Sequence, residues 1–246
     1  EIPIISRDSF NSSFLGHNVT PTANLLKKGV ATVGPYIIAF APCQHVILAS
    51  SPWIHFGYNM INLHLKTGFE LNRNEKVAFM ASYFKTYNEE RSATYIDAVG
   101  DRTDYTYLLY KQHSTTYSLL YSNKISSIYS IHTALSYLYF FDDTHPYSLH
   151  MESFKPDKHE WIVSALHETR LMNNFGINVE TGLLGLNYRY PYLHYGVSFT
   201  YVDRDWLIQL GMSHTMPTSG AHDRIDLENY RPTDAVHPEI QLQRFF

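Results

Sequence analysis

The stretch NMINLHLKTGFEL, residues 59–71, decides the fold class because apolar and polar residues alternate along it. Its apolar positions are Ile61, Leu63, Leu65, Phe69 and Leu71. Between them sit Asn62, His64, Lys66, Gly68 and Glu70. Successive side chains of a strand point to opposite faces, so this segment has one apolar face and one polar, partly charged face. A helix would mix the two sets on every side.

The same alternation recurs along the chain, in residues 127–139, 149–152, 192–202 and 206–213. Residues 77–84 differ because they are apolar at nearly every position, which indicates a strand whose second face meets a packed interior or a plug. No helical periodicity accompanies these segments. The chain therefore belongs to the all-β class.

Polar connections of two kinds separate the expected strands. Short turns such as 72–75, 122–124, 173–174 and 203–205 are built from turn-forming residues. Longer polar stretches occupy 88–104, 142–158 and 217–237. Short turns that broadly alternate with long loops are typical of outer-membrane barrels, with about 12 strands expected here and a range of roughly 10 to 14. We therefore predict a single antiparallel up-and-down transmembrane β-barrel.

The expected barrel covers residues 30–246, and residues 1–29 form an N-terminal periplasmic arm or the first strand. The polar start of this arm is also compatible with a plug. Because the chain starts at Glu1 and not at methionine, we expect the mature form of an exported protein.

Alternation alone does not separate a membrane barrel from a soluble all-β protein, because both need it. The apolar face from Ile61 to Leu71 is long enough for a tilted strand to cross the hydrocarbon, which needs about 9–11 residues. Charged residues make up only 17% of the chain, and it contains 20 tyrosines. Aromatic residues such as Tyr139, Tyr201 and Trp206 stand at strand ends, as in an interfacial girdle. These features favour the membrane barrel.

The last nine residues, PEIQLQRFF at 238–246, carry a more specific signal. They resemble the terminal strand of Gram-negative outer-membrane β-barrel proteins, which ends in an aromatic residue preceded by alternating apolar residues. Ile240, Leu242 and Phe246 match that pattern, whereas Arg244 stands where an apolar residue is usual. The resemblance implies a bacterial outer-membrane location, contact with outer-membrane lipids, and recognition of these three residues by the barrel assembly machinery.

Charge and composition argue against several other classes. The formal net charge is −4 and no basic patch is present, so nucleic acid is not an expected partner. The single cysteine, Cys43, excludes an internal disulfide. The 14 histidines are scattered and form no HExxH motif, so we expect neither a metal nor a cofactor.

The polar faces of the strands supply the candidate functional residues. An Arg or Lys that points to lipid at mid-depth costs about 2–4 kcal/mol, so charged side chains should face the lumen. The expected lumen-facing residues are Asn62, His64, Lys66, Glu70, His132, His150, Glu152, Glu180 and His194. They could set the selectivity of a pore, or they could pair with interior charges and fill the barrel.

We therefore expect a porin-like passive channel for small solutes or ions. The first alternative is a structural outer-membrane barrel that forms homo-oligomers without transport. The second is an outer-membrane lipid hydrolase, which would need a serine activated by a histidine. His132 with Ser130 or Ser136, and His194 with Ser198, share strand faces, but no GxSxG motif accompanies them. No catalytic residue is assigned, and we do not expect an enzyme.

Overall fold

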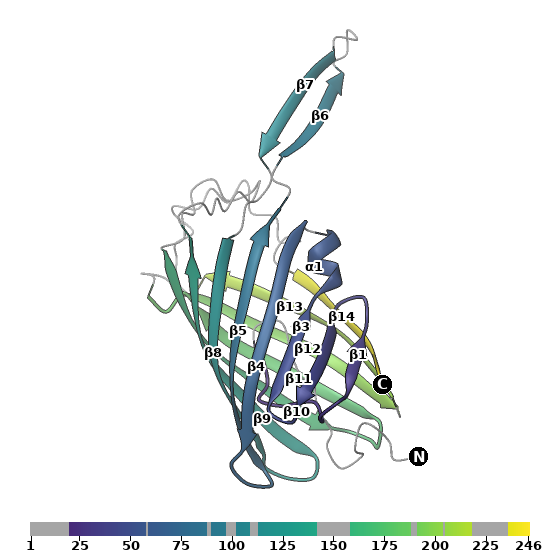
Figure 1. Ribbon diagram of the computed structural model, residues 1–246. Helices are drawn as coiled ribbons and strands as arrows, with labels where there is room; N and C mark the ends of the chain where they lie inside the picture. Colours follow the sequence, from purple (N-terminus) through teal and green to yellow (C-terminus); the bar gives the residue numbers. More distant parts are fainter. Residues whose placement is uncertain are drawn as a thin grey trace.

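A computed structural model describes most of the chain as one closed barrel (Figure 1). It describes residues 20–57, 59–87, 90–96, 102–108, 113–141, 158–187, 191–203, 205–217 and 236–246. Within 88–112 and 217–239 it describes the backbone of strands but no side chains.

Twelve antiparallel strands close the barrel, in the order β1-β14-β13-β12-β11-β10-β9-β8-β5-β4-β3-β2. Their bounds are β1 Ala31–Val33, β2 Ile38–Cys43, β3 Val46–Ser50, β4 Met60–Glu70, β5 Glu75–Thr86, β8 His113–Lys124, β9 Tyr129–Phe140, β10 His159–Arg170, β11 Phe175–Leu184, β12 Tyr192–Asp203, β13 Trp206–Pro217 and β14 Val236–Phe245. The prediction of an antiparallel up-and-down barrel of about 12 strands is confirmed. Strands β4 to β14 of the barrel have 10 to 12 residues each.

Three further elements lie outside the barrel wall. Strands β6 (Glu90–Ile96) and β7 (Arg102–Leu108) form a separate two-stranded sheet, which projects beyond one end of the barrel in Figure 1. The expectation of a loop over residues 88–104 is therefore wrong, because β6 and the start of β7 fall there. The short helix α1 (Pro52–Gly57) connects β3 to β4. No helix in the described part of the chain is long and apolar enough to cross a bilayer.

The connections fall into two groups. The turns at 71–74, 125–128, 171–174 and 204–205 are short and lie at the end of the barrel where the C-terminus is placed (Figure 1). At the opposite end, longer stretches of sequence separate β5 from β8, β9 from β10, β11 from β12 and β13 from β14. The sequence had suggested a turn at 122–124. In the structure, Ser122 and Lys124 belong to β8. In outer-membrane barrels, the end with the short turns is the periplasmic one.

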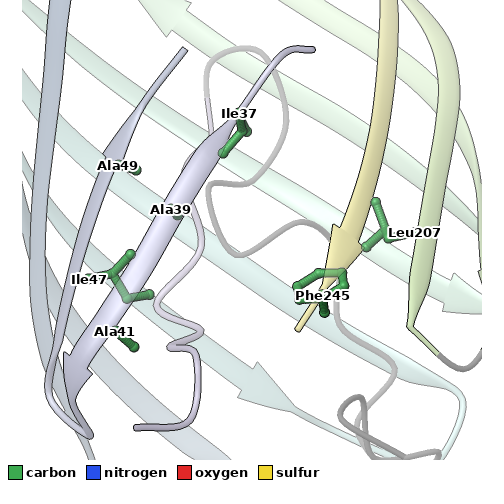
Figure 2. Packing of buried hydrophobic residues seen from close by; sticks show 7 residues of the cluster. All are labelled: Ile37, Ala39, Ala41, Ile47, Ala49, Leu207 and Phe245. Atoms are coloured by element: carbon green, nitrogen blue, oxygen red, sulfur yellow. The ribbon is translucent and has the colours of Figure 1, made fainter. Parts of the chain in front are cut away.

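One apolar cluster closes the interior beside the short strands β1–β3. It consists of Ile37, Ala39, Ala41, Ile47, Ala49, Leu207 and Phe245, all buried (Figure 2). Because β1 shares only two residue pairs with β14, the ladder is shortest where the barrel closes. The cluster packs side chains of β2 and β3 against those of β13 and β14 on the inside of this closure.

Candidate functional site: the barrel interior and residues 20–26

The outer surface of the barrel is apolar on every strand. Each strand of the wall exposes at least one large apolar side chain, for example Val33, Phe40, Leu48, Leu63, Phe79, Leu119, Leu135, Val163, Val179, Phe199, Leu210 and Ile240. A soluble barrel would bury this face. An exposed apolar surface that runs around a closed barrel fits the hydrocarbon of a bilayer.

The interior is the polar side. The buried side chains of the wall are mostly serine, threonine, asparagine, glutamine, histidine and charged residues, as in Asn62, Lys66, Ser82, Ser118, His132, Ser136, Ser164, Glu168, Asn178, Glu180, His194, Ser198, Thr200, Gln209 and Ser213. Together with the apolar exterior and the short turns at one end, this polar interior decides the class. The chain is an outer-membrane β-barrel. The predicted class and location are thereby confirmed.

Residues 20–26 lie inside this barrel and have no regular secondary structure. The main-chain N–H of Thr20 donates to Glu180 Oε1 of β11 at 2.5 Å. The carbonyl of Thr22 accepts from Lys66 Nζ of β4 at 2.8 Å. The N–H of Ala23 donates to Ser122 Oγ of β8 at 2.8 Å. Since β4 and β11 lie nearly opposite in the strand order, these contacts carry the segment across the lumen.

Apolar contacts hold the same segment at two further places. Ala23 is 1% exposed and belongs to a buried cluster with Ala78, Met80, Leu120 and Ala134. Leu25 and Leu26 pack against the cluster beside β1–β3 described above. Residues 77–84, for which the sequence indicated a packed interior or a plug, thus contribute Ala78 and Met80 to the cluster that contains Ala23.

Three histidines on the inner wall share one arrangement. Each stands directly opposite a hydroxyl residue of the neighbouring strand: His64 opposite Ser82, His132 opposite Ser122, and His194 opposite Thr215. In each pair the ring Nδ1 lies within hydrogen-bond distance of the hydroxyl oxygen, at 2.8, 2.7 and 2.9 Å respectively. The hydroxyl therefore fixes the ring orientation in all three places.

Two of these histidines also meet a buried carboxylate. His132 Nε2 lies 3.0 Å from Glu168 Oε2, and His194 Nε2 lies 3.0 Å from Glu180 Oε2. Glycines Gly182 and Gly196 stand directly opposite His194 and Glu180, which leaves room for the two side chains to meet diagonally. Glu180 thus joins the wall histidine to Thr20 of the interior segment.

The other predicted lumen residues have different surroundings. Asn62 is 1% exposed and bonds both main-chain groups of Ser51, so it anchors the chain ahead of α1. The side chain of Glu70 is 67% exposed at the end of β4 and pairs with Lys76, so it stands apart from the buried group. His150 and Glu152 lie outside the described residues.

Ser122, Glu168 and residues 20–26 were not among the sequence candidates. Ser122 was assigned to a turn. Glu168 belongs to β10, whose inner face also carries Ile162 and Leu166, so polar alternation is weak there. Strict residue parity along β10 would have placed Glu168 on the same face as Ser164. Residues 20–26 show no strand pattern that could have indicated their position.

The C-terminal strand presents its expected signal outward. Ile240, Leu242 and Phe246 are exposed, and Gln241 and Gln243 are buried between them. Recognition of these three residues by the assembly machinery stays a prediction.

Arg244 lies on the same outward face. Its Nε lies 3.1 Å from Asp205 Oδ2, and its guanidinium lies over the rings of Trp206 and Phe246 at 5.5 and 5.1 Å. The charge is thus held at the turn end of the barrel, which explains why an arginine is tolerated at this position of the terminal strand.

Comparison with known proteins adds the following. No protein-family model and no curated protein matches the sequence. Among solved structures, the CymD monoaromatic hydrocarbon channel is similar with a TM-score of 0.44 and 10% identity, over 86% of this chain and 56% of that protein. The toluene transporter TodX of Pseudomonas putida is similar with a TM-score of 0.43 and 9% identity, over 88% of this chain and 67% of that protein. The chain thus spans little more than half the length of the first.

Proposed function

We propose that this barrel is a passive channel for small polar solutes or ions, closed in the described state by residues 20–26. The observation that carries the proposal is the polar inner wall. A barrel that served only as a scaffold would be most stable with an apolar filling, because buried polar groups cost free energy unless they are hydrogen-bonded. Here the wall places charged and amide side chains such as Lys66, Glu168 and Asn178 inside.

The contacts of the interior segment support reversible closure. They are non-covalent, and they include hydrogen bonds that link Thr20, Thr22 and Ala23 to three different strands. No strand pairing ties the segment to the wall. Displacement therefore leaves the ladder of the barrel intact and exposes Lys66, Glu180 and Ser122 to the lumen.

Current across planar bilayers tests this function. Ala23→Arg puts a long charged side chain into the buried apolar cluster that Ala23 forms with Ala78, Met80, Leu120 and Ala134, so the segment must leave. Ala23→Gly keeps the N–H and fits the same space, which makes it the matched control. We expect the wild type and Ala23→Gly to show rare, brief openings and Ala23→Arg to conduct steadily.

Two outcomes would count against the proposal. One is an Ala23→Arg barrel that folds but passes no current at any voltage. The other is liposome uptake of toluene, the solute named for one of the two similar barrels, in place of small sugars and ions. The second outcome would keep a channel but reject a polar solute.

A row of three side chains in contact favours lipid hydrolysis as a second candidate function. Ser122 Oγ, His132 and Glu168 form a continuous serine–histidine–carboxylate line with contacts of 2.7 and 3.0 Å. Sequence reasoning paired His132 with Ser130 or Ser136, whereas the structure pairs it with Ser122. Ser122 is 4% exposed and accepts the Ala23 N–H, so its hydroxyl is covered in this state. Ester hydrolysis by Ala23→Arg that disappears with an added Ser122→Ala would support this candidate over the channel.

A further inference from the structure

Glu168 and Asn178 stand directly opposite each other on the polar inner faces of β10 and β11. Both side chains are buried, with exposures of 1 and 0%. Each nevertheless keeps one oxygen, Glu168 Oε1 and Asn178 Oδ1, that has no hydrogen-bond partner in the described part of the chain. Buried polar atoms are nearly always hydrogen-bonded, so two exceptions on one residue pair require an explanation.

The contacts of the other polar atoms turn these two oxygens toward each other. Glu168 Oε2 lies 3.0 Å from His132 Nε2 on β9, the strand on the far side of β10. Asn178 Nδ2 donates to Thr200 Oγ1 at 2.8 Å and to Ser198 Oγ at 3.2 Å, both on β12 beyond β11. The two polar atoms of a carboxylate or an amide lie on opposite sides of their carbon, so Oε1 and Oδ1 are left on the side where β10 and β11 face each other. The Cβ atoms of such an opposed pair are about 4.5–5.5 Å apart, which leaves room for a small ion between the two oxygens.

The charges around the pair favour a cation at this position. Among the described residues, no cationic side chain bonds Glu168 Oε1. Arg170 stands two residues further along β10, but its guanidinium donates to the main-chain carbonyls of Met172 and Asn173 in the following turn. Glu180, which is 0% exposed, stands diagonally across from Glu168 on β11 and adds a second buried carboxylate. Two acceptor oxygens that face each other beside a further carboxylate repel one another unless a positive charge or a donor lies between them.

We propose that Glu168 Oε1 and Asn178 Oδ1 bind a calcium ion in the lumen wall, with water completing its shell. Calcium takes carboxylate and amide oxygens in irregular geometry, whereas magnesium demands a near-ideal octahedron. A transition metal would favour a histidine nitrogen, but both ring nitrogens of His132 already have partners, Ser122 Oγ and Glu168 Oε2. No sequence motif marks the pair, because only the register of β10 and β11 brings the two residues together.

The ligand count sets the expected strength of the site. In the described part of the chain, no three His, Cys, Asp or Glu side chains converge on a metal position. One carboxylate, one amide oxygen and water therefore make up the proposed shell. Such a shell belongs at the weak end of calcium sites, with a dissociation constant of about 0.1–1 mM.

The ion would lie close to the contacts that hold the interior segment. Glu168 Oε2 contacts His132, whose Nδ1 contacts Ser122 Oγ, and this oxygen accepts the N–H of Ala23. Because the ion uses Oε1, it leaves that line intact and fixes the carboxylate at its end. A ligand that binds only the folded protein stabilises it, so calcium should raise the unfolding temperature of the barrel. The site is part of the wall and does not depend on whether the barrel conducts.

Calcium binding to the full-length protein in detergent tests the inference. Isothermal titration calorimetry with calcium chloride, after removal of metal with EGTA, measures the affinity at constant ionic strength. The wild type and Ala23→Arg are both titrated, because the interior segment covers the wall in the wild type. We expect saturable binding with a dissociation constant of about 0.1–1 mM. Saturation of either protein supports the site, and saturation of Ala23→Arg alone would add that the segment controls access to it.

Two substitutions at the site should change the affinity in opposite directions. Glu168→Gln keeps the length of the side chain and an oxygen for His132 but removes the charge, so calcium should bind at least about tenfold more weakly. Asn178→Asp supplies a second carboxylate, so calcium should bind at least about fivefold more tightly. A misfolded barrel cannot produce that gain. Glu70→Gln is the matched control, because it removes the same charge from an exposed position at the end of β4 and should leave the affinity unchanged.

The inference is overturned if neither folded protein binds calcium below about 10 mM. In that case the pair is satisfied without metal, by a proton on Glu168 or by an Asn178 amide that turns its nitrogen toward the carboxylate. It is also overturned if Glu70→Gln weakens binding as much as Glu168→Gln, since the attraction would then be a diffuse one to acidic groups. The heat-modifiable gel shift of a folded barrel confirms that each variant has folded.

The binding assay needs no current, so its outcome is separate from that of the channel. A barrel that conducts without binding calcium refutes the calcium site alone. A barrel that binds calcium but never conducts refutes the channel and leaves the site.

Discussion

Replacing Lys66 by methionine should open the barrel without removing any part of residues 20–26. Lys66 is 1% exposed, and its Nζ donates to the Thr22 carbonyl at 2.8 Å. A hydrogen bond to a charged group contributes about 1.5–3 kcal/mol. Since each 1.4 kcal/mol corresponds to about a factor of ten in an equilibrium constant, Lys66→Met should raise the open-to-closed ratio about 10- to 150-fold.

Long single-channel recordings measure this ratio directly as the open probability. Methionine has a similar length and no charge, so the neighbouring wall residues keep their packing and the change is restricted to the interactions of the ammonium group. Because a buried ammonium group also costs desolvation energy, the barrel itself could become more stable, and urea unfolding in vesicles should be measured alongside.

Lys76→Met is the matched control, since it removes the same charge from the neighbouring strand. Lys76 pairs with Glu70, a contact between strand ends that does not involve residues 20–26. An exposed pair of this kind contributes about 1 kcal/mol or less to folding. The reasoning fails if Lys66→Met changes the open probability less than threefold, or if Lys76→Met changes it equally.

Three substitutions test other parts of the structure through urea unfolding in lipid vesicles. Glu180→Ala removes the acceptor for a buried histidine and for a main-chain N–H, so the free energy of unfolding should fall by about 1–3 kcal/mol for each. Glu180→Gln keeps one side-chain oxygen and should lower it less. Equal losses for the two variants would contradict this reasoning. Leu119→Arg, in the centre of β8, should lower the free energy of unfolding by about 2–4 kcal/mol. Ile128→Arg, in an exposed turn, should leave it nearly unchanged. Equal losses for the two variants would argue against a lipid-facing surface. Gly211→Ala would place a Cβ 2.4 Å from the Ser198 Cβ of the paired strand, so we expect a loss of about 1–3 kcal/mol, and an unchanged midpoint would contradict that register.

Strand periodicity made the wall of this barrel predictable. Along β4, every second residue from Ile61 to Phe69 except Thr67 is a large apolar side chain, and Asn62 and Lys66 are buried on the other face. The alternation of side chains between the two faces follows from strand backbone geometry, so it does not depend on what fills the barrel. The same rule indicated which face of each strand was polar.

The content of the lumen was not predictable in this way. Residues 20–26 are held there in part by main-chain hydrogen bonds, and main-chain groups leave no mark in a sequence. The contacts of His132 depend on the register that brings Ser122 opposite it and Glu168 within diagonal reach. Register in a barrel is a property of paired strands, so no single segment contains it.

The β6–β7 pair was missed for a related reason. Residues 90–96 and 102–108, ERSATYI and RTDYTYL, are mostly polar and lack the regular alternation of large apolar residues seen in the barrel strands. Without an apolar face they resemble a loop in composition. The pairing of one strand with the other, and not hydrophobic alternation, defines them.

The most direct test of the central claim is the accessibility of position 23 in the folded, membrane-inserted protein. Cys43 is the only native cysteine, so Ala23→Cys in a Cys43→Ser background carries a single thiol. Its rate of reaction with a bulky, membrane-impermeant maleimide can be compared with that of Lys28→Cys, at an exposed position of the same N-terminal region. We predict that the thiol at position 23 reacts far more slowly than that at position 28 and that adding Lys66→Met accelerates it. Equal rates at the two positions in the otherwise unchanged barrel would show that residues 20–26 do not close the lumen.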